Sequence, residues 1–85
     1  MSDGGLTRFE VDILTVLSAD GPRIGRDIQR EIEAYYENEI NHGRLYPVLD
    51  QLDQEGLIRK MPGPDRRSNH YALTARGIRV LEDRY

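Results

Sequence analysis

The turn at residues 62–65, which reads Pro-Gly-Pro-Asp, most limits what this chain can fold into, because no helix can cross it. Each proline lacks an amide donor and fixes its own φ angle, so the chain reverses direction here. Short runs of strand-forming residues flank the turn at 57–61 and 68–73. Because Tyr71 and Leu73 alternate toward one side, the region predicts a two-stranded β-hairpin.

A capping box predicts the first helix, over residues 8–18. The Thr7 hydroxyl accepts from the amide of Glu10, while the Glu10 carboxylate reaches back to the amide of Thr7. Residues 20–22, Asp-Gly-Pro, end this helix, and apolar residues at helical spacing predict a second helix over 25–36. The inward-facing positions expected in these helices are Phe9, Ile13, Val16, Leu17, Ile24, Ile28, Ile32, Tyr35 and Tyr36.

A third helix is expected over residues 42–55, with Asn41 as its N-cap and Gly56 as the residue that ends it. Pro47 falls inside this helix, where its ring crowds the carbonyl four residues back. That residue is Gly43, whose backbone adjusts more easily than most, so the proline is tolerated with a local bend. The buried stripe of the third helix is Leu45, Val48, Leu49 and Leu52.

Thr74 is expected to cap a last helix over residues 75–85. Three helices, a hairpin and a closing helix predict a winged helix-turn-helix, a mostly helical α+β fold whose wing is the two-stranded hairpin. We expect this domain to cover residues 7–85, after a flexible N-terminal segment at 1–6.

The length and the cysteine count exclude several classes of protein. A chain of 85 residues without cysteine makes one domain and holds no disulfide or thiolate metal site. No apolar run approaches the ~20 residues that a membrane span needs, and no charged-then-apolar start indicates a signal peptide. We therefore expect a soluble cytoplasmic protein with no membrane partner.

Charge is unevenly distributed along the chain. Residues 1–55 hold 5 basic and 12 acidic residues, a net of −7, whereas residues 56–85 hold 7 basic and 3 acidic residues, a net of +4. A polyanion should therefore prefer the C-terminal third. Lys60 is the only lysine among 12 basic residues, and this composition fits a salt-loving source.

The predicted fold itself suggests double-stranded DNA as the partner. A helix fits the DNA major groove, its N-terminal amides suit phosphate, and a basic hairpin beside it reaches the flanking backbone or minor groove. The far half of the third helix carries Asp50, Asp53 and Glu55, so it should tilt away from the phosphates. Tyr46 lies off the buried stripe and is expected to face DNA rather than the core. The expected DNA contacts are Arg23, Arg26, Asn41, His42, Gly43, Arg44, Tyr46, Pro47, Arg59, Lys60, Arg66, Arg67, Asn69 and His70.

Two segments resemble the PadR-like family of transcriptional regulators. Residues 41–58 read NHGRLYPVLDQLDQEGLI, with the Leu-Tyr-Pro core and Glu-Gly-Leu-Ile ending of that family. Arg67 and residues 71–77, YALTARG, resemble its return strand and entry to the next helix. The resemblance covers about residues 7–81 and implies a homodimeric repressor on a palindromic operator, with Tyr46 at the DNA. Longer members carry an extended C-terminal helical region for dimerisation, whereas this chain stops at Tyr85.

The dimer interface is therefore expected on the first and last helices. Val11 and Leu14 widen the apolar face of the first helix, and they either complete the core or seat a partner subunit. In the competing arrangement the last helix folds back onto the first within one chain and covers both apolar surfaces. The expected interface residues are Val11, Leu14, Ile78, Leu81 and Tyr85.

Other functions find little support in the sequence. It has no glycine-rich phosphate loop, nucleophile elbow or acid–base cluster, so an enzyme is not expected. His42 and His70 lack the partners of a metal site, and no cofactor is expected. Tyr35 and Tyr36 either pack at their helix end or line an aromatic ligand site between protomers, so a small-molecule effector stays undefined. The alternative function is a winged-helix module that binds proteins instead of DNA.

Overall fold

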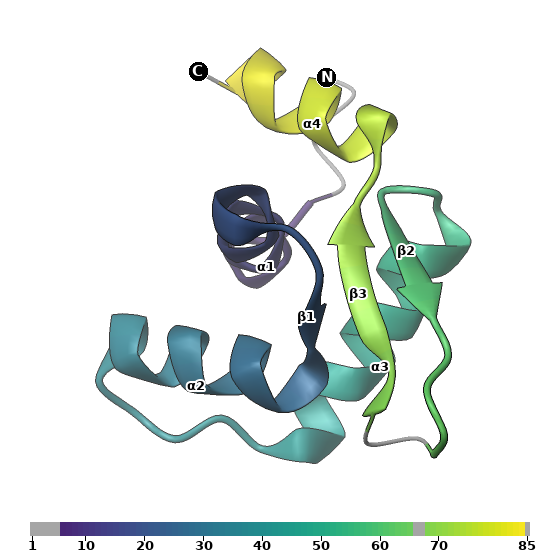
Figure 1. Ribbon diagram of the computed structural model, residues 1–85. Coiled ribbons are helices and arrows are strands. Elements are labelled where there is room, and N and C mark those ends of the chain that lie inside the picture. The colour runs from purple at the N-terminus through teal and green to yellow at the C-terminus, as the bar shows by residue number, and fades with distance from the viewer. Residues whose placement is uncertain (1–5, 66–67, 85) are drawn as a thin grey trace.

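The computed structural model describes residues 6–65 and 68–84, which form a bundle of helices beside a small sheet (Figure 1). The four helices, β2 and β3 follow the order predicted from the sequence, and β1 is a strand that was not predicted. The elements are α1 (Arg8–Asp20), β1 (Arg23–Ile24), α2 (Gly25–Tyr36), α3 (His42–Gln54), β2 (Ile58–Met61), β3 (His70–Leu73) and α4 (Ala75–Arg84).

The capping box at the start of α1 is confirmed. The Thr7 amide donates to Glu10 Oε1 at 2.7 Å, and the Glu10 amide donates to Thr7 Oγ1 at 3.1 Å. The helix runs two residues further than expected, to Asp20, and ends at Gly21 with a φ of 85°. Only glycine adopts such a φ without strain, so Gly21 allows the sharp exit from α1.

The sheet has three strands rather than the two of the predicted hairpin. Its order is β1-β3-β2, with all neighbours antiparallel. Strand β1 was missed because two residues are too few to show an alternating pattern. Tyr71 of β3 lies opposite Arg23 of β1 and Lys60 of β2, so the central strand joins the start of α2 to the wing.

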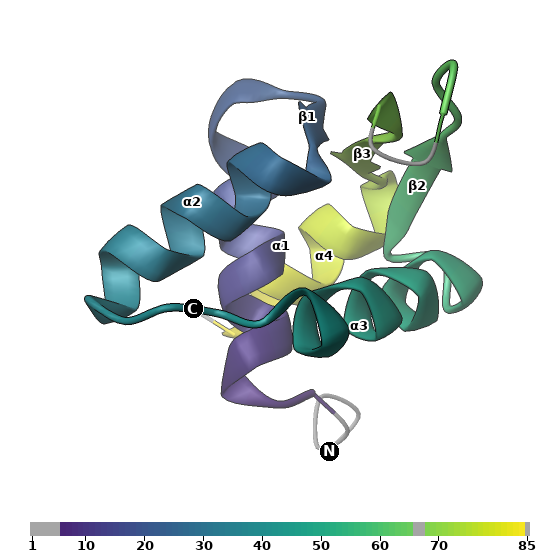
Figure 2. The ribbon, with the colours of Figure 1, turned by 90° about the horizontal axis from the view of Figure 1, so that it is seen from below.

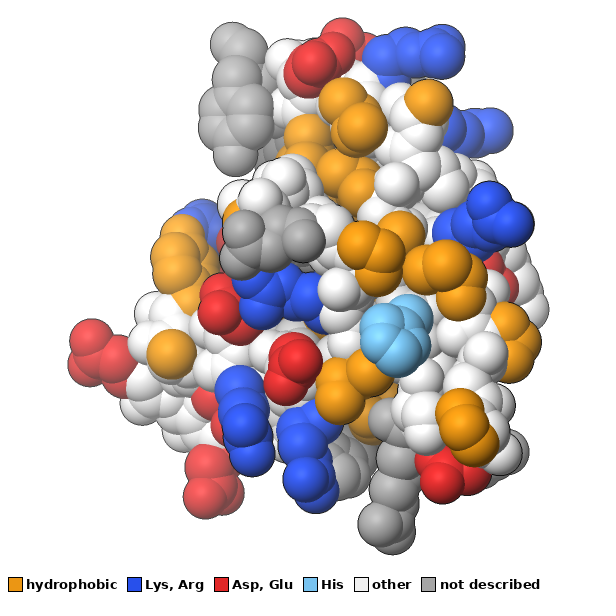
Figure 3. Space-filling model, in the orientation of Figure 1, with side chains coloured by type: hydrophobic (Ala, Val, Ile, Leu, Met, Phe, Trp, Pro, Cys, Tyr) orange, Lys and Arg blue, Asp and Glu red, His pale blue; other side chains and the backbone are white. Residues whose placement is uncertain are grey.

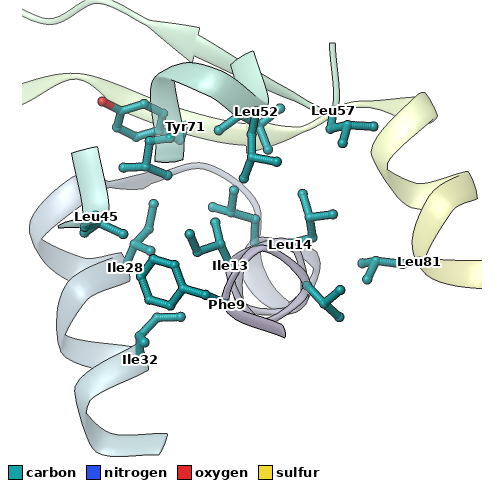
Figure 4. Packing of buried hydrophobic residues seen from close by; sticks show 14 of the residues in the cluster. Phe9, Ile13, Leu14, Ile28, Ile32, Leu45, Leu52, Leu57, Tyr71 and Leu81 are labelled. Carbon is teal, nitrogen blue, oxygen red and sulfur yellow. The ribbon is translucent and has the colours of Figure 1, made fainter. Parts of the chain in front are cut away.

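The core lies between α1, α2, α3 and the inner face of the sheet (Figure 4). Tyr71 is 2% exposed and Leu73 packs against the same core, as their alternation predicts. Leu14 is 0% and Val11 8% exposed within the single chain, so both complete the core. Neither offers the free apolar surface that the expected dimer interface needs, and this part of the expectation is corrected.

Helix α4 folds back onto α1, as the competing arrangement proposed. Leu81 is 7% exposed and joins the core cluster, so it too is covered by its own chain. Ile78 stays 46% exposed, whereas Tyr85 lies outside the described residues. Thr74 caps α4, because its Oγ1 accepts from the amide of Gly77 at 3.0 Å.

The end of α3 is closed by a Schellman arrangement. The Leu57 amide donates to the carbonyl of Leu52, and the Gly56 amide donates to the carbonyl of Asp53, both at 3.0 Å. Gly56 has a φ of 78°, as expected for the residue that ends a helix. Only residues 55–57 separate α3 from β2, so the wing begins directly where α3 ends.

Candidate nucleic-acid interface

Three elements expected to meet DNA lie at one end of the molecule. Figure 2 views this end, where α2, the chain leading into α3, and the loop between β2 and β3 all face the viewer. Helix α4 lies at the opposite end (Figure 1). The candidate site is therefore a surface made from α2, the start of α3 and the wing.

The N-terminus of α3 is well formed for phosphate contact. Asn41 caps it, with Oδ1 accepting from the amide of Gly43 at 2.6 Å. The first turn contains no acidic residue, so nothing there offsets the positive end of the helix dipole. Gly43 and Pro47 are exposed on this helix, while the side chain of His42 lies outside the described part.

The chain between α2 and α3 is held by two side chains of α2 that the sequence analysis did not identify. Gln29 Nε2 donates to the carbonyl of Ile40 at 2.8 Å, and the Ile40 amide donates to Glu33 Oε2 at 2.9 Å. Ile40 itself is 5% exposed and anchors the loop in the core. These bonds fix the point at which α3 begins.

Arg44 leans from α3 toward α1. Its guanidinium carbon lies 4.4 Å from the ring centroid of Phe9, a cation–π arrangement. The residue remains exposed overall, so one face of the guanidinium packs while the side chain stays at the surface.

The side chain of Tyr46 is partly buried. It packs against the core cluster, and its ring lies over Gly25 at the start of α2. The expectation that the ring points away from the core is therefore corrected, because the glycine leaves room for the ring to lie against α2. The sequence signal for this packing was Gly25 itself, a residue without a side chain at the first position of a helix.

The two basic residues of β2 point to opposite faces of the sheet. Arg59 is exposed, whereas Lys60 points toward α3, where its Nζ lies 3.3 Å from Asp50 Oδ1. This geometry follows from the alternation of side chains along a strand. Arg59 is thus better placed than Lys60 to meet a polyanion.

The other expected wing contacts lie on or before β3. His70 is exposed, and Asn69 Oδ1 accepts from the amide of Gly63 at 3.1 Å, which ties the two sides of the loop together. Arg66 and Arg67 lie outside the described residues.

Arginines also line the start of the second helix. Arg26 is exposed, but the side chain of Arg23 is only 17% exposed and lies 3.5 Å from Glu31 Oε2. Arg30, which the sequence analysis left out, is exposed four residues after Arg26. Figure 3 shows basic and acidic side chains interspersed over α2, so this side presents no continuous basic surface.

A polar and aromatic cluster joins α1 to the end of α2. Tyr36 Oη donates to Asp12 Oδ2 at 2.5 Å, and Arg8 Nε lies 3.5 Å from Asp12 Oδ1. Burial, followed by the bond to Asp12, raises the pKa of Tyr36. Tyr35, expected on the apolar side of α2, is instead 64% exposed, with its ring centroid 5.8 Å from that of Tyr36.

Residues 6–65 and 68–84 show neither a metal-binding cluster nor a membrane-spanning helix. Within these ranges no three His, Cys, Asp or Glu side chains gather as metal binding requires. None of the described helices has the length and apolar character needed to cross a membrane.

Comparison with known proteins identifies the family. The model of the transcriptional regulator PadR-like family matches residues 13–83. The chain belongs to this family. It is a winged-helix transcriptional regulator. The proteins of this family and the regulators of similar structure are transcription factors without enzymatic activity.

Solved structures of regulators share this fold. RosR from H. salinarum is 48% identical with a TM-score of 0.88, over 96% of this chain and 73% of that one. A transcriptional regulator from Clostridium thermocellum is 25% identical with a TM-score of 0.74, over 88% and 74% of the two chains. A MarR mutant from E. coli, complexed with operator DNA, is 20% identical with a TM-score of 0.78, over 96% and 55% of the chains, and supports the fold alone. No curated protein sequence matches the chain.

Proposed function

We propose that this PadR-like regulator binds double-stranded DNA sequence-specifically as a homodimer and represses transcription. The start of α3 would enter the major groove, and the wing would contact the flanking backbone or minor groove. The observation that carries the proposal is the capped, acid-free N-terminus of α3, which lies on the same end of the molecule as the loop of the wing.

The proposed contacts fall into two groups. Near the bases, the candidates are the residues at the start of α3: Asn41, His42, Gly43, Arg44, Tyr46 and Pro47. On the phosphates, the candidates are Arg26, Arg30, Arg59, Arg66, Arg67, Asn69 and His70, with Arg23 and Lys60 in supporting positions because each faces a carboxylate. A protein with this role would act in the cytoplasm.

The acidic half of α3 supports the same orientation. Asp50 is exposed, and carboxylates beside phosphates are repelled, so the helix should approach the groove by its N-terminal half. The net charge of −3 also predicts weak binding to random DNA, because non-specific affinity comes from phosphate neutralisation.

The experiment is a binding titration with genomic fragments, followed by footprinting of the retained sequence. We expect the selected site to bind at least ~10³-fold more tightly than random duplex of equal length, measured at one fixed salt concentration. Equal affinity for every duplex, or no binding at any salt, would overturn the proposal and favour a protein-binding module.

A further inference from the structure

The acidic residues of α3 lie at the end of the helix where electrostatics disfavours them. The first turn has none, yet Asp50 and Asp53 fall in the last two turns, near the negative end of the dipole. No basic residue occupies the last turn to offset them. Acidic residues that are unfavourable at their own helix end are expected to make a favourable contact elsewhere in the fold.

That interaction is with the wing. Asp53 Oδ1 accepts from the backbone amide of Lys60 at 3.0 Å, in a partly buried position. Strand β2 is the edge of the sheet, because β3 pairs with it on one side only. The amide of Lys60 donates to Asp53 and not to β3, so Asp53 satisfies a donor that the edge strand would otherwise leave to water.

The bond is placed where it controls the angle between helix and wing. Residues 55–57 form the whole connection between α3 and β2, and Thr74 Oγ1 fixes this connection by donating toward the carbonyl of Gly56 at 2.7 Å. The connection holds the base of β2, whereas Asp53 holds it three residues further along, at Lys60. Two fixed points on one strand define its direction.

The side chain of Lys60 adds a weaker second link. Its Nζ pairs with Asp50 at 3.3 Å, but the two side chains are 34% and 57% exposed. Solvent and salt screen such a pair, so it contributes little. The backbone bond to Asp53 is the stronger candidate for the anchor.

We propose that Asp53 is a positioning residue, which holds the wing strand at the angle that lets α3 and the wing engage one DNA duplex together. This rests on the proposed DNA-binding function. Asp53 does not touch DNA in this scheme, since its carboxylate faces β2 from the acidic half of α3. It acts through the direction of β2, and thus through Arg59 at its exposed face.

The test compares Asp53→Ala with Asp53→Asn. Both variants remove the same negative charge, but asparagine keeps a side-chain oxygen that accepts from Lys60. We expect Asp53→Ala to weaken binding to the selected site by roughly tenfold or less, the scale of one lost hydrogen bond, and Asp53→Asn to bind within about twofold of the original chain. Asp50→Asn serves as the matched control for loss of a neighbouring charge.

A double-mutant cycle separates positioning from general destabilisation. In an Arg59→Ala background the proposed contact from β2, the strand that Asp53 holds, is already missing, so Asp53→Ala should then cost less than its original loss in affinity, on a logarithmic scale. An equal loss in both backgrounds would overturn the positioning role. Equal affinity of Asp53→Ala and Asp53→Asn would also overturn it.

Hydrogen exchange of the Lys60 amide in the free protein gives a readout that does not need DNA. We expect exchange at this amide to accelerate in Asp53→Ala and to stay slow in Asp53→Asn, with amides of α1 unchanged in both. Identical exchange in all three proteins would overturn the anchor even if DNA binding is confirmed. Failure of the original chain to bind any duplex, with the exchange pattern as expected, would instead overturn the proposed function and leave Asp53 as a fold contact only.

Discussion

The phenol ring of Tyr46 lies over Gly25, so closely that a methyl group on Gly25 would come within 2.5 Å of the phenol oxygen. This contact joins α3 to the start of α2, and Tyr46 belongs to the residues packed around the core. A tyrosine in this position has a packing role as well as its proposed role at DNA. The contact therefore links the fold of the helix-turn-helix to its binding surface.

Replacing Gly25 with alanine should displace the Tyr46 ring. We expect a loss of about 1–3 kcal/mol in the free energy of unfolding, as for other insertions into packed sites, together with weaker DNA binding. In a Tyr46→Ala background the clash is gone, so the same change should be neutral or stabilising, since alanine suits helices better than glycine. Urea unfolding of the four proteins measures this coupling, and additive effects would contradict the contact.

Replacing Gly77 with alanine should be more harmful, because the new methyl group would meet backbone. The methyl group would overlap the carbonyl oxygen of Leu57, and Leu73 Cδ1 would lie 2.7 Å away. We expect about 3 kcal/mol of destabilisation, the upper end of the usual cost of overpacking, because the methyl group meets backbone that the Thr74 hydroxyl also binds. Arg79→Ala, at an exposed position of the same helix, is the control and should unfold near the original temperature.

The close contacts of Gly25 and Gly77 are with residues distant in the sequence, and the sequence did not predict them. The caps of α1, α3 and α4 were predictable, because each depends on residues within three positions of the helix start. Strand β1 was not, since its two residues become a strand only by pairing with β3. Local patterns are visible in the sequence, whereas contacts between distant segments are not.

The same distinction applies to the candidate site. The start of α3 and the exposed Arg59 follow from helix and strand periodicity. The partial burial of Tyr46 and the ion pair of Arg23 depend on α2, whose position relative to α3 no periodicity gives. Val11 and Leu14 were open to two interpretations, because a wide apolar face looks the same whether its own chain or a partner covers it.

Arg59 and Lys60 should differ in their contribution to DNA binding although they are neighbours. Arg59→Ala should lower the slope of log affinity against log salt by about 0.9, the value for one lost phosphate contact. Lys60→Ala should change the slope less, because its ammonium group already faces Asp50 at 3.3 Å. Titrations at several salt concentrations measure both slopes, and a larger change for Lys60→Ala would contradict the assigned facing.

Tyr36 should make stability fall at alkaline pH. Its pKa is raised by burial and by the bond to Asp12, so the folded state favours the protonated phenol. The contribution of the Tyr36 phenol to the free energy of unfolding is complete below its unfolded-state pKa of ~10. It is lost as pH rises through the higher pKa of the folded state. Tyr36→Phe should unfold more easily at neutral pH, by about 1–3 kcal/mol, because Asp12 Oδ2 loses its hydrogen-bond donor, but it should lose less stability above pH ~10.

Urea unfolding at a series of pH values measures this difference. Tyr71, whose pKa is also raised by burial, is present in both proteins, so the difference between their curves isolates Tyr36. Tyr35→Phe is the control, because that ring is 64% exposed and no bond joins it to Asp12 among the described contacts. Parallel curves for the original chain and Tyr36→Phe would contradict the prediction.

Ile78 is the best remaining candidate for the proposed dimer interface. It is 46% exposed on α4, at the end of the molecule opposite the start of α3 (Figure 1), so pairing there leaves both recognition helices accessible. A two-fold axis brings the same patch of each subunit together, and Ile78→Asp would then place two like charges in one apolar contact. We expect this variant to shift sedimentation toward a 9.8 kDa monomer at micromolar concentration. It should also lose affinity for a palindromic site whose halves lie ~34 Å apart, while binding an isolated half-site normally.

Ala34→Asp adds the same charge at an exposed position of α2 and should remain dimeric. An original chain that stays monomeric even on DNA would leave the interface without support.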